Sequence, residues 1–217
     1  MAPEKSASSR GRRIAAILVA LVVVAVVGFT SGRLSAPVTS TPSTTSNEAG
    51  FARDMQVHHA QAVELSMIVR DATDDAPVRL LAYDIATTQA QQEGQMYGWL
   101  NQWKLPQASP EPQMTWMTRA ALNGTGHEHD PALIAAGAPM PGYATSDQIA
   151  QLKSLTGVEA EKYFLTLMIA HHQGGVEMAK AIINRTQDQL IINFANGIVV
   201  GQTAEITAMQ DMLAARS

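Results

Sequence analysis

Two short segments of the sequence repeat the pattern Met-x-x-His-His, and their side chains are suited to binding a metal ion. The six residues are Met55, His58, His59, Met168, His171 and His172. Imidazole is the commonest metal ligand among side chains, and the methionine thioether is a soft donor. A lone histidine on an apolar face is more often a packed core residue, but paired histidines at two matching places favour a metal site.

The donor types in the chain restrict which ion could bind. The sequence has no cysteine, which excludes disulfides, thiolate ligands and thiol catalysis. Thioethers favour Cu(I), and imidazole also suits Cu(II) and zinc, whereas calcium and magnesium prefer oxygen donors. A di-iron centre in a helical bundle uses Glu-x-x-His, which neither segment contains. We therefore expect copper, as Cu(I) or Cu(II), with zinc as the weaker alternative.

Helix geometry indicates that these donors face inward. At about 100° per residue, the methionine and both histidines of each segment fall on the apolar face. A small residue, Ala62 or Gly175, follows one turn after each histidine pair and leaves room for something other than a side chain. Glu64 and Glu177 fall nearly opposite, where we expect solvated carboxylates.

Two further stripes of side chains follow the histidine segments at helical spacing (i, i+4, i+7 and i+11). They are Ile85, Gln89, Gln92 and Met96, and Ile198, Gln202, Glu205 and Met209. Buried amides and carboxylates are unfavourable unless they are paired. Facing imidazoles or a bound ion would supply the partners, so we expect these residues to support the ligands. The alternative is a solvated helix edge.

Both sets of residues belong to an internal repeat with a constant offset of 113 residues, as from Met55 to Met168. The repeated units, 51–100 and 164–213, each show helical periodicity interrupted by one polar turn. We expect helices over 48–71, 77–104, 158–185 and 189–215. Two hairpins that bury their apolar stripes against each other form an all-α four-helix bundle.

The segment between the repeats, 105–145, contains six prolines and is expected to be irregular. A short helix is expected over 114–122, and Thr145 or Ser146 could cap another that starts near Asp147. The length of this crossover suggests parallel hairpins. His127 and His129 lie within it, where an exposed loop is a better interpretation than an auxiliary metal site.

The N-terminus predicts export. Residues 1–13 are basic and an unbroken apolar run covers 14–29. This pattern favours an uncleaved signal anchor in the cell membrane, with the remainder outside the cytoplasm; a cleaved signal peptide is the alternative. Residues 30–47 read as a tether, so the folded domain is expected over 48–217. The net charge of −4 argues against a nucleic-acid partner.

The residues also resemble a known family, the DUF305 domain. The resemblance rests on Phe51-Ala-Arg-Asp-Met-Gln-Val-His-His59, on the matching segment from Phe164 to Ala179, on Met140-Pro-Gly142 and on the segment from Gln202 to Met209. It implies an exported, ferritin-like helical domain with copper binding or copper resistance in some members, and the six Met-x-x-His-His residues as ligands. Tyr143 and Gln92 depart from the family pattern.

These observations favour an exported metal-binding module for sequestering or handling copper. Two alternatives remain open: a ferritin-like metal-dependent oxidoreductase, and a structural or interaction domain in which His and Met are only packed. The scarcity of inward carboxylates speaks against the enzyme. The pattern does not determine the oligomeric state or the stoichiometry.

Overall fold

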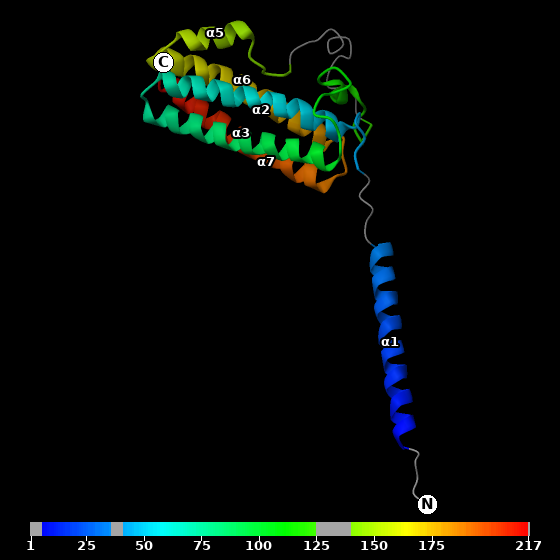
Figure 1. The fold of residues 1–217 in the computed structure, drawn as a ribbon. Helices are drawn as coiled ribbons and strands as arrows, with labels where there is room; N and C mark the ends of the chain where they lie inside the picture. Colours follow the sequence, from blue (N-terminus) through cyan, green and yellow to red (C-terminus); the bar gives the residue numbers. More distant parts are fainter. Residues whose placement is uncertain (1–5, 36–40, 125–139, 217) are drawn as a thin grey trace, which may run out of the picture. The chain divides into compact units, whose positions relative to one another are not determined.

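The computed structural model describes residues 6–35, 41–124 and 140–216, and within these ranges every regular element is helical. This confirms the all-α prediction. The chain divides into two compact units, Met1–Thr41 and Pro42–Ser217, and Figure 1 gives the order of their helices. His127 and His129 lie outside the described residues.

The first unit contains α1 (Ser6–Ser35), a helix of 30 residues. Among the described residues it is the one helix long and apolar enough to cross a membrane, over Gly11–Gly32 with a mean hydropathy of 2.8. The predicted apolar run, 14–29, lies within this stretch. Such a helix is compatible with either an anchor or a signal sequence.

The second unit is built on four long helices joined as two hairpins. They are α2 (Asn47–Ala72), α3 (Ala76–Gln102), α6 (Gly157–Ile183) and α7 (Gln189–Ala214). The carboxylates of Asp75 and Asp188 accept backbone N–H groups at the starts of α3 and α7. Such caps satisfy helix N-termini, which explains why the chain turns at matching places in both hairpins. The helices end within two residues of the predicted boundaries.

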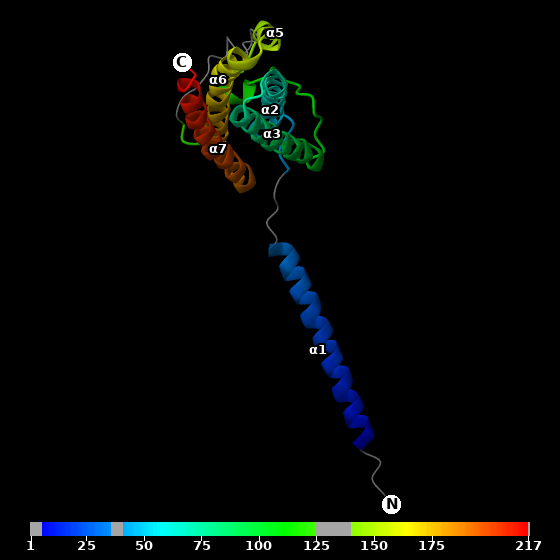
Figure 2. The same ribbon diagram turned by 90° about the vertical axis from the view of Figure 1, so that its left-hand side faces the viewer.

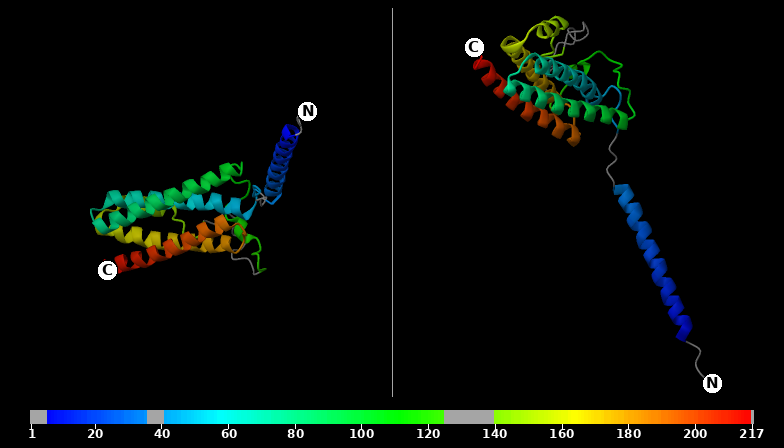
Figure 3. Two further views of the ribbon diagram at one scale, coloured as in Figure 1. Left: turned by 90° about the horizontal axis from the view of Figure 1, so that it is seen from below. Right: turned by 60° about the vertical axis from the view of Figure 1, so that its left-hand side comes forward.

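The two hairpins pack together through α2 and α6, which run antiparallel (Figure 2 and Figure 3). Phe51 near the start of α2 shares a cluster with Ile182 near the end of α6, and Val69 near the end of α2 shares another with Phe164. The predicted parallel arrangement is therefore wrong. Because α3 ends where α2 begins, an antiparallel α6 starts at the other end of the second unit, and the crossover connects these two ends.

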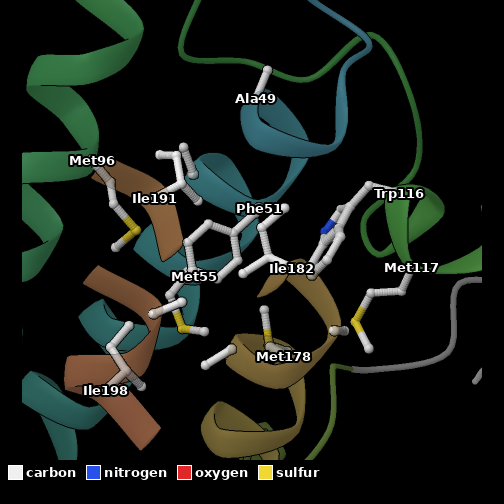
Figure 4. Close-up of a cluster of buried hydrophobic side chains, with 14 of the residues drawn as sticks. Ala49, Phe51, Met55, Met96, Trp116, Met117, Met178, Ile182, Ile191 and Ile198 are labelled. Atoms are coloured by element: carbon white, nitrogen blue, oxygen red, sulfur yellow. The ribbon is translucent and has the colours of Figure 1, made fainter. Parts of the chain in front are cut away.

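The core consists of two hydrophobic clusters separated along the α2–α6 pair. The first cluster, drawn in Figure 4, is centred on Phe51 and contains Met55, Met96, Met178 and Ile198. The second cluster is centred on Phe164 and contains Leu65, Ile85, Met168 and Met209. The segment of α2 and α6 between the clusters carries the histidines.

The described parts of the crossover, 105–124 and 140–154, pack on α2 and α6 through η1 and α5. Asp54 of α2 accepts hydrogen bonds from the Met114 backbone N–H (2.7 Å) and from Trp116 Nε1 (2.9 Å). The predicted helix over 114–122 is only a short 3-10 turn, η1 (Thr115–Thr118). Further on, α5 (Ser146–Ser154) begins with a Thr145 capping box and packs against α2 and α6.

Candidate metal centre

Four histidines form a polar layer between the two hydrophobic clusters. His58 and His59 come from α2, His171 and His172 come from α6, and all four side chains are fully buried. The rings of His58 and His171 stack with their centroids 3.7 Å apart and their planes at 30°. The helix crossing therefore brings together two histidine pairs that are far apart in the sequence.

Each of the four rings uses Nε2 for a hydrogen bond to an oxygen atom. The pairs are His58 with Pro141 O (3.1 Å), His59 with Gln92 Oε1 (2.8 Å), His171 with His58 O (3.0 Å) and His172 with Glu205 Oε2 (2.8 Å). Carbonyl and carboxylate oxygens only accept hydrogen bonds. A neutral ring in such a pair therefore carries its hydrogen on Nε2 and keeps a lone pair on Nδ1.

All four Nδ1 atoms are buried and have no hydrogen-bond partner. A buried nitrogen without a partner is unfavourable by about 1–3 kcal/mol, so four such atoms in one layer require an explanation. Metal-binding histidines commonly donate their other ring N–H to a carbonyl or carboxylate, which fixes the ring orientation. The residues present therefore fit the donor chemistry of a metal site: four Nδ1 atoms have no protein partner, and each ring is held through its Nε2.

Burial keeps three of these imidazoles neutral. Desolvation lowers the pKa of His58 to about 4 and that of His59 to about 3, with the neighbouring histidines as a smaller cause. It also lowers the pKa of His171 well below the usual range. At neutral pH these three rings carry no charge, which is the protonation state that a metal ligand requires.

The predicted stripes on the second helix of each hairpin lie beside this layer. Gln89 of α3 and Gln202 of α7 are buried, and neither the oxygen nor the nitrogen of either amide has a partner. A Cβ atom on Gly175 would lie 2.3 Å from Gln202 Oε1, so the glycine provides the space that this amide occupies. Gln92 and Glu205 lie one turn further and hold His59 and His172.

The methionines lie on either side of the histidine layer. Met55 packs in the first cluster with Met96, and Met168 packs in the second cluster with Met209. The structure thus does not bring Met55 and Met168 together, because equivalent positions on antiparallel helices diverge from the crossing point. Each of these two methionines remains one helical turn from its own histidine pair.

A loop over residues 140–144 closes the layer on the crossover side. Tyr143 N–H donates to Met140 O (3.1 Å), and Gly142 sits in the turn with a φ of 68°. Gln61 of α2 bonds both backbone groups of Ala144. A Cβ atom on Gly174 of α6 would lie 1.9 Å from Pro141 O, so only glycine admits the loop here.

Sequence reasoning missed Gln61 and Asp54 because both lie on the flank of α2 that the crossover covers. Helical spacing places them on the side of His58 away from His59, which is a signal that could have found them. The expectation for the opposite face is met: Glu64 is half exposed and pairs with Lys153 at 2.9 Å. Glu177 is also exposed.

Within the described ranges, no three His, Asp or Glu side chains converge on a point that could hold an ion. The four Nδ1 atoms are therefore unpartnered donors in one layer and do not form a ready-made coordination site.

Residues 48–213 match the model of the family described as "Domain of unknown function (DUF305)". A DUF305 protein of Streptomyces coelicolor, whose name describes it as secreted, is 48% identical with a TM-score of 0.70; the match covers 80% of this chain and 96% of that one. CopM in its Cu(II)-bound form is 20% identical with a TM-score of 0.58, over 79% and 98% of the two chains. At that identity the likeness shows the fold alone.

A curated relative is the uncharacterized protein L153 of Acanthamoeba polyphaga mimivirus. It is 40% identical over 53 residues, which are 24% of this chain and 35% of that protein. This chain therefore matches about a third of the relative's length.

Proposed function

We propose, from the premise that the chain belongs to the DUF305 family, that its helical unit binds copper through the buried histidine layer. One observation carries this proposal: four buried imidazoles each keep an unpartnered Nδ1 atom while Nε2 is engaged by an oxygen. Imidazoles that are only packed in a core would leave these four nitrogens unsatisfied.

The donor chemistry favours copper over other ions. Imidazole and thioether side chains are soft or intermediate ligands that suit Cu(I), and imidazole also accepts Cu(II). CopM, which shares the fold, has been solved in Cu(I)-bound, Cu(II)-bound and silver-bound forms. Silver and Cu(I) are both soft cations, so a comparable preference here would follow from the same donor types.

Ten of the twelve predicted residues have a role in this proposal. The Nδ1 atoms of His58, His59, His171 and His172 would be the nitrogen ligands, and Met55 and Met168 would supply thioethers. Gln92 and Glu205 orient two of the rings. Met96 and Met209 pack beside the ligand methionines. The bound ion would give the orphaned nitrogens the partner that the protein does not provide.

We further propose that the unit acts outside the cytoplasm, as a module that sequesters or handles copper. The apolar helix over Gly11–Gly32 supports this placement, either as an anchor in the cell membrane or as a signal sequence. The name of the related Streptomyces protein describes that protein as secreted. An exported module without cysteine does not depend on the redox state of its compartment for its ligands.

Competition titration of the full chain in detergent with a chromogenic Cu(I) chelator tests the proposal. Replacing His59→Leu and His172→Leu together is expected to weaken Cu(I) binding by roughly 100-fold or more, since loss of supporting residues alone weakens such sites 10–100-fold. The matched control replaces the other histidine pair, His127→Ala and His129→Ala, and should bind like the wild type.

Helix content measured by circular dichroism identifies a variant that has merely unfolded. A folded leucine variant that binds Cu(I) as tightly as the wild type would show that the histidine layer is not the copper site.

A further inference from the structure

A narrow groove between α3 and α7 is lined in part by the two residues that hold His59 and His172. Its cavity volume is about 80 Å³. The lining residues come from the two repeat-related stripes and from small residues beside them: Gln89, Gln92, Gly197, Gly201, Gln202 and Glu205. Figure 1 shows α3 and α7 on the side of the helices opposite α5, so this groove lies away from the crossover.

The groove is lined by two buried amides whose polar atoms are unused. Gln89 is 2% exposed and Gln202 is 4% exposed, yet all four amide atoms lack a partner. Two repeat-related residues with the same defect in one groove are not explained by packing, since buried polar groups are normally satisfied. A water molecule or a hydrated cation in the groove would supply hydrogen-bond partners for these amide atoms.

Unpartnered atoms continue from the groove into the layer. Gln92 and Glu205 line the groove and also hold His59 and His172, whose Nδ1 atoms are themselves unpartnered. Gln92 and Glu205 therefore connect the groove directly to two rings of the histidine layer.

The opposite side of the layer is closed by internal hydrogen bonds. A larger cavity of about 410 Å³ lies on the outer face of α2 and includes Gln61 and Tyr143 in its lining. Between this cavity and the layer, Gln61 is bonded to Ala144 and His58 is bonded to Pro141. None of the residues that line this cavity holds a histidine of the layer through a hydrogen bond, unlike Gln92 and Glu205 in the groove.

We propose that the α3–α7 groove is the port through which copper reaches and leaves the histidine layer. This inference rests on the proposed function. The groove offers the carboxylate of Glu205 and the amide oxygens of Gln89 and Gln202, which are hard donors that hold a soft cation weakly. The softer imidazole and thioether donors lie further in. Because the donors in the groove bind copper weakly and the donors further in bind it strongly, the ion can pass through the groove without being held there.

Filling the groove tests the port. Gly197 and Gly201 line it, and a Cβ atom on either meets nothing within 4 Å. The double variant Gly197→Leu/Gly201→Leu should slow both Cu(I) uptake and Cu(I) release to a chelator by roughly tenfold or more in stopped-flow measurements, because gating changes rates. The equilibrium affinity should stay within about threefold, since no ligand has changed.

The chain offers a matched control on α3. Gly94 and Gly98 have the same spacing, are exposed and also meet nothing within 4 Å, but they do not line the groove. Gly94→Leu/Gly98→Leu should leave both rates unchanged. The alanine pair at Gly197 and Gly201 provides a smaller obstruction, and its effect should fall between the wild type and the leucine pair.

The outcomes separate the two proposals. If the wild-type chain does not bind Cu(I), both the proposed function and the port are refuted. Normal binding with unchanged rates in the leucine pair overturns the port alone. The variant Ala60→Trp fills the outer cavity on α2. If Cu(I) exchange is slower in this variant but normal in the leucine pair, the route lies on the other side and the port is also overturned.

Discussion

Lowering the pH from 7 to 5 is expected to remove about 4 kcal/mol of unfolding free energy from the metal-free protein. Three buried histidines have a pKa below the ordinary value in the folded state: His58 at about 4, His59 at about 3, and His171 well below its usual range. In the unfolded chain they bind protons near pH 6.5. Below that pH the unfolded state takes up protons that the folded state refuses, so stability falls.

Asp54 acts in the opposite direction and reduces the slope. Burial raises the pKa of its carboxyl to about 6, although the hydrogen bonds from Met114 and Trp116 lower it. Between about pH 6 and 4 the folded state therefore holds one proton that the unfolded state lacks. In this window the unfolded state binds three more histidine protons than the folded state, and the folded state binds one more carboxyl proton. The net difference of two protons lowers the unfolding free energy by about 3 kcal/mol per pH unit.

Urea unfolding followed by circular dichroism at pH 7, 6.5, 6, 5.5 and 5 measures this dependence. The variant Asp54→Asn serves as the comparison, because its amide oxygen can still accept both hydrogen bonds while the titrating group is gone. The unfolding free energy of this variant should fall more steeply than that of the wild type, by about 1 kcal/mol more for each pH unit. A wild-type stability that is flat or rises between pH 6.5 and 5 would contradict the neutral, buried histidine layer.

The substitution Gly174→Ala is expected to destabilise the protein by about 3 kcal/mol. Its Cβ atom would lie 1.9 Å from Pro141 O and 2.4 Å from Pro141 C, which are backbone atoms. The loop over 140–144 must then move, and the carbonyl that accepts the His58 Nε2 hydrogen bond moves with it. The change thus adds a steric clash and leaves a buried imidazole less well satisfied.

Gly98→Ala on α3 is the matched control for that substitution. Gly98 is exposed, and its Cβ atom would meet nothing within 4 Å. The better helix propensity of alanine should stabilise this variant by up to about 1 kcal/mol. Chemical denaturation of both variants measures the difference. Equal stability of Gly174→Ala and the wild type would show that the loop does not pack on α6 as described.

The arrangement of the helices illustrates what helical periodicity can predict. It indicates which face of each helix is apolar, and the structure places His58, His59, His171 and His172 on buried faces as expected. Periodicity does not indicate which element covers a face. The antiparallel crossing of α2 and α6 depends on the fit of the apolar faces, so the prediction of parallel hairpins was wrong.

The details of the candidate site depend on contacts that a local pattern does not contain. The Pro141 carbonyl reaches His58 only because Gly142 turns the chain and Gly174 admits it. The family resemblance pointed to Met140-Pro-Gly142 without indicating this contact. The separation of Met55 and Met168 into different clusters also follows from the tertiary crossing rather than from their matching positions.

The most direct test of the account is a long-range ¹H–¹⁵N spectrum of the protein labelled with ¹⁵N-histidine, recorded while Cu(I) is added. In the metal-free protein, the buried rings of His58, His59 and His171 should show a protonated Nε2 and an unprotonated Nδ1. Stoichiometric Cu(I) should shift Nδ1 resonances of His58, His59, His171 and His172 and leave Nε2 protonated. Bound Cu(I) that leaves all four Nδ1 resonances unchanged would contradict the account.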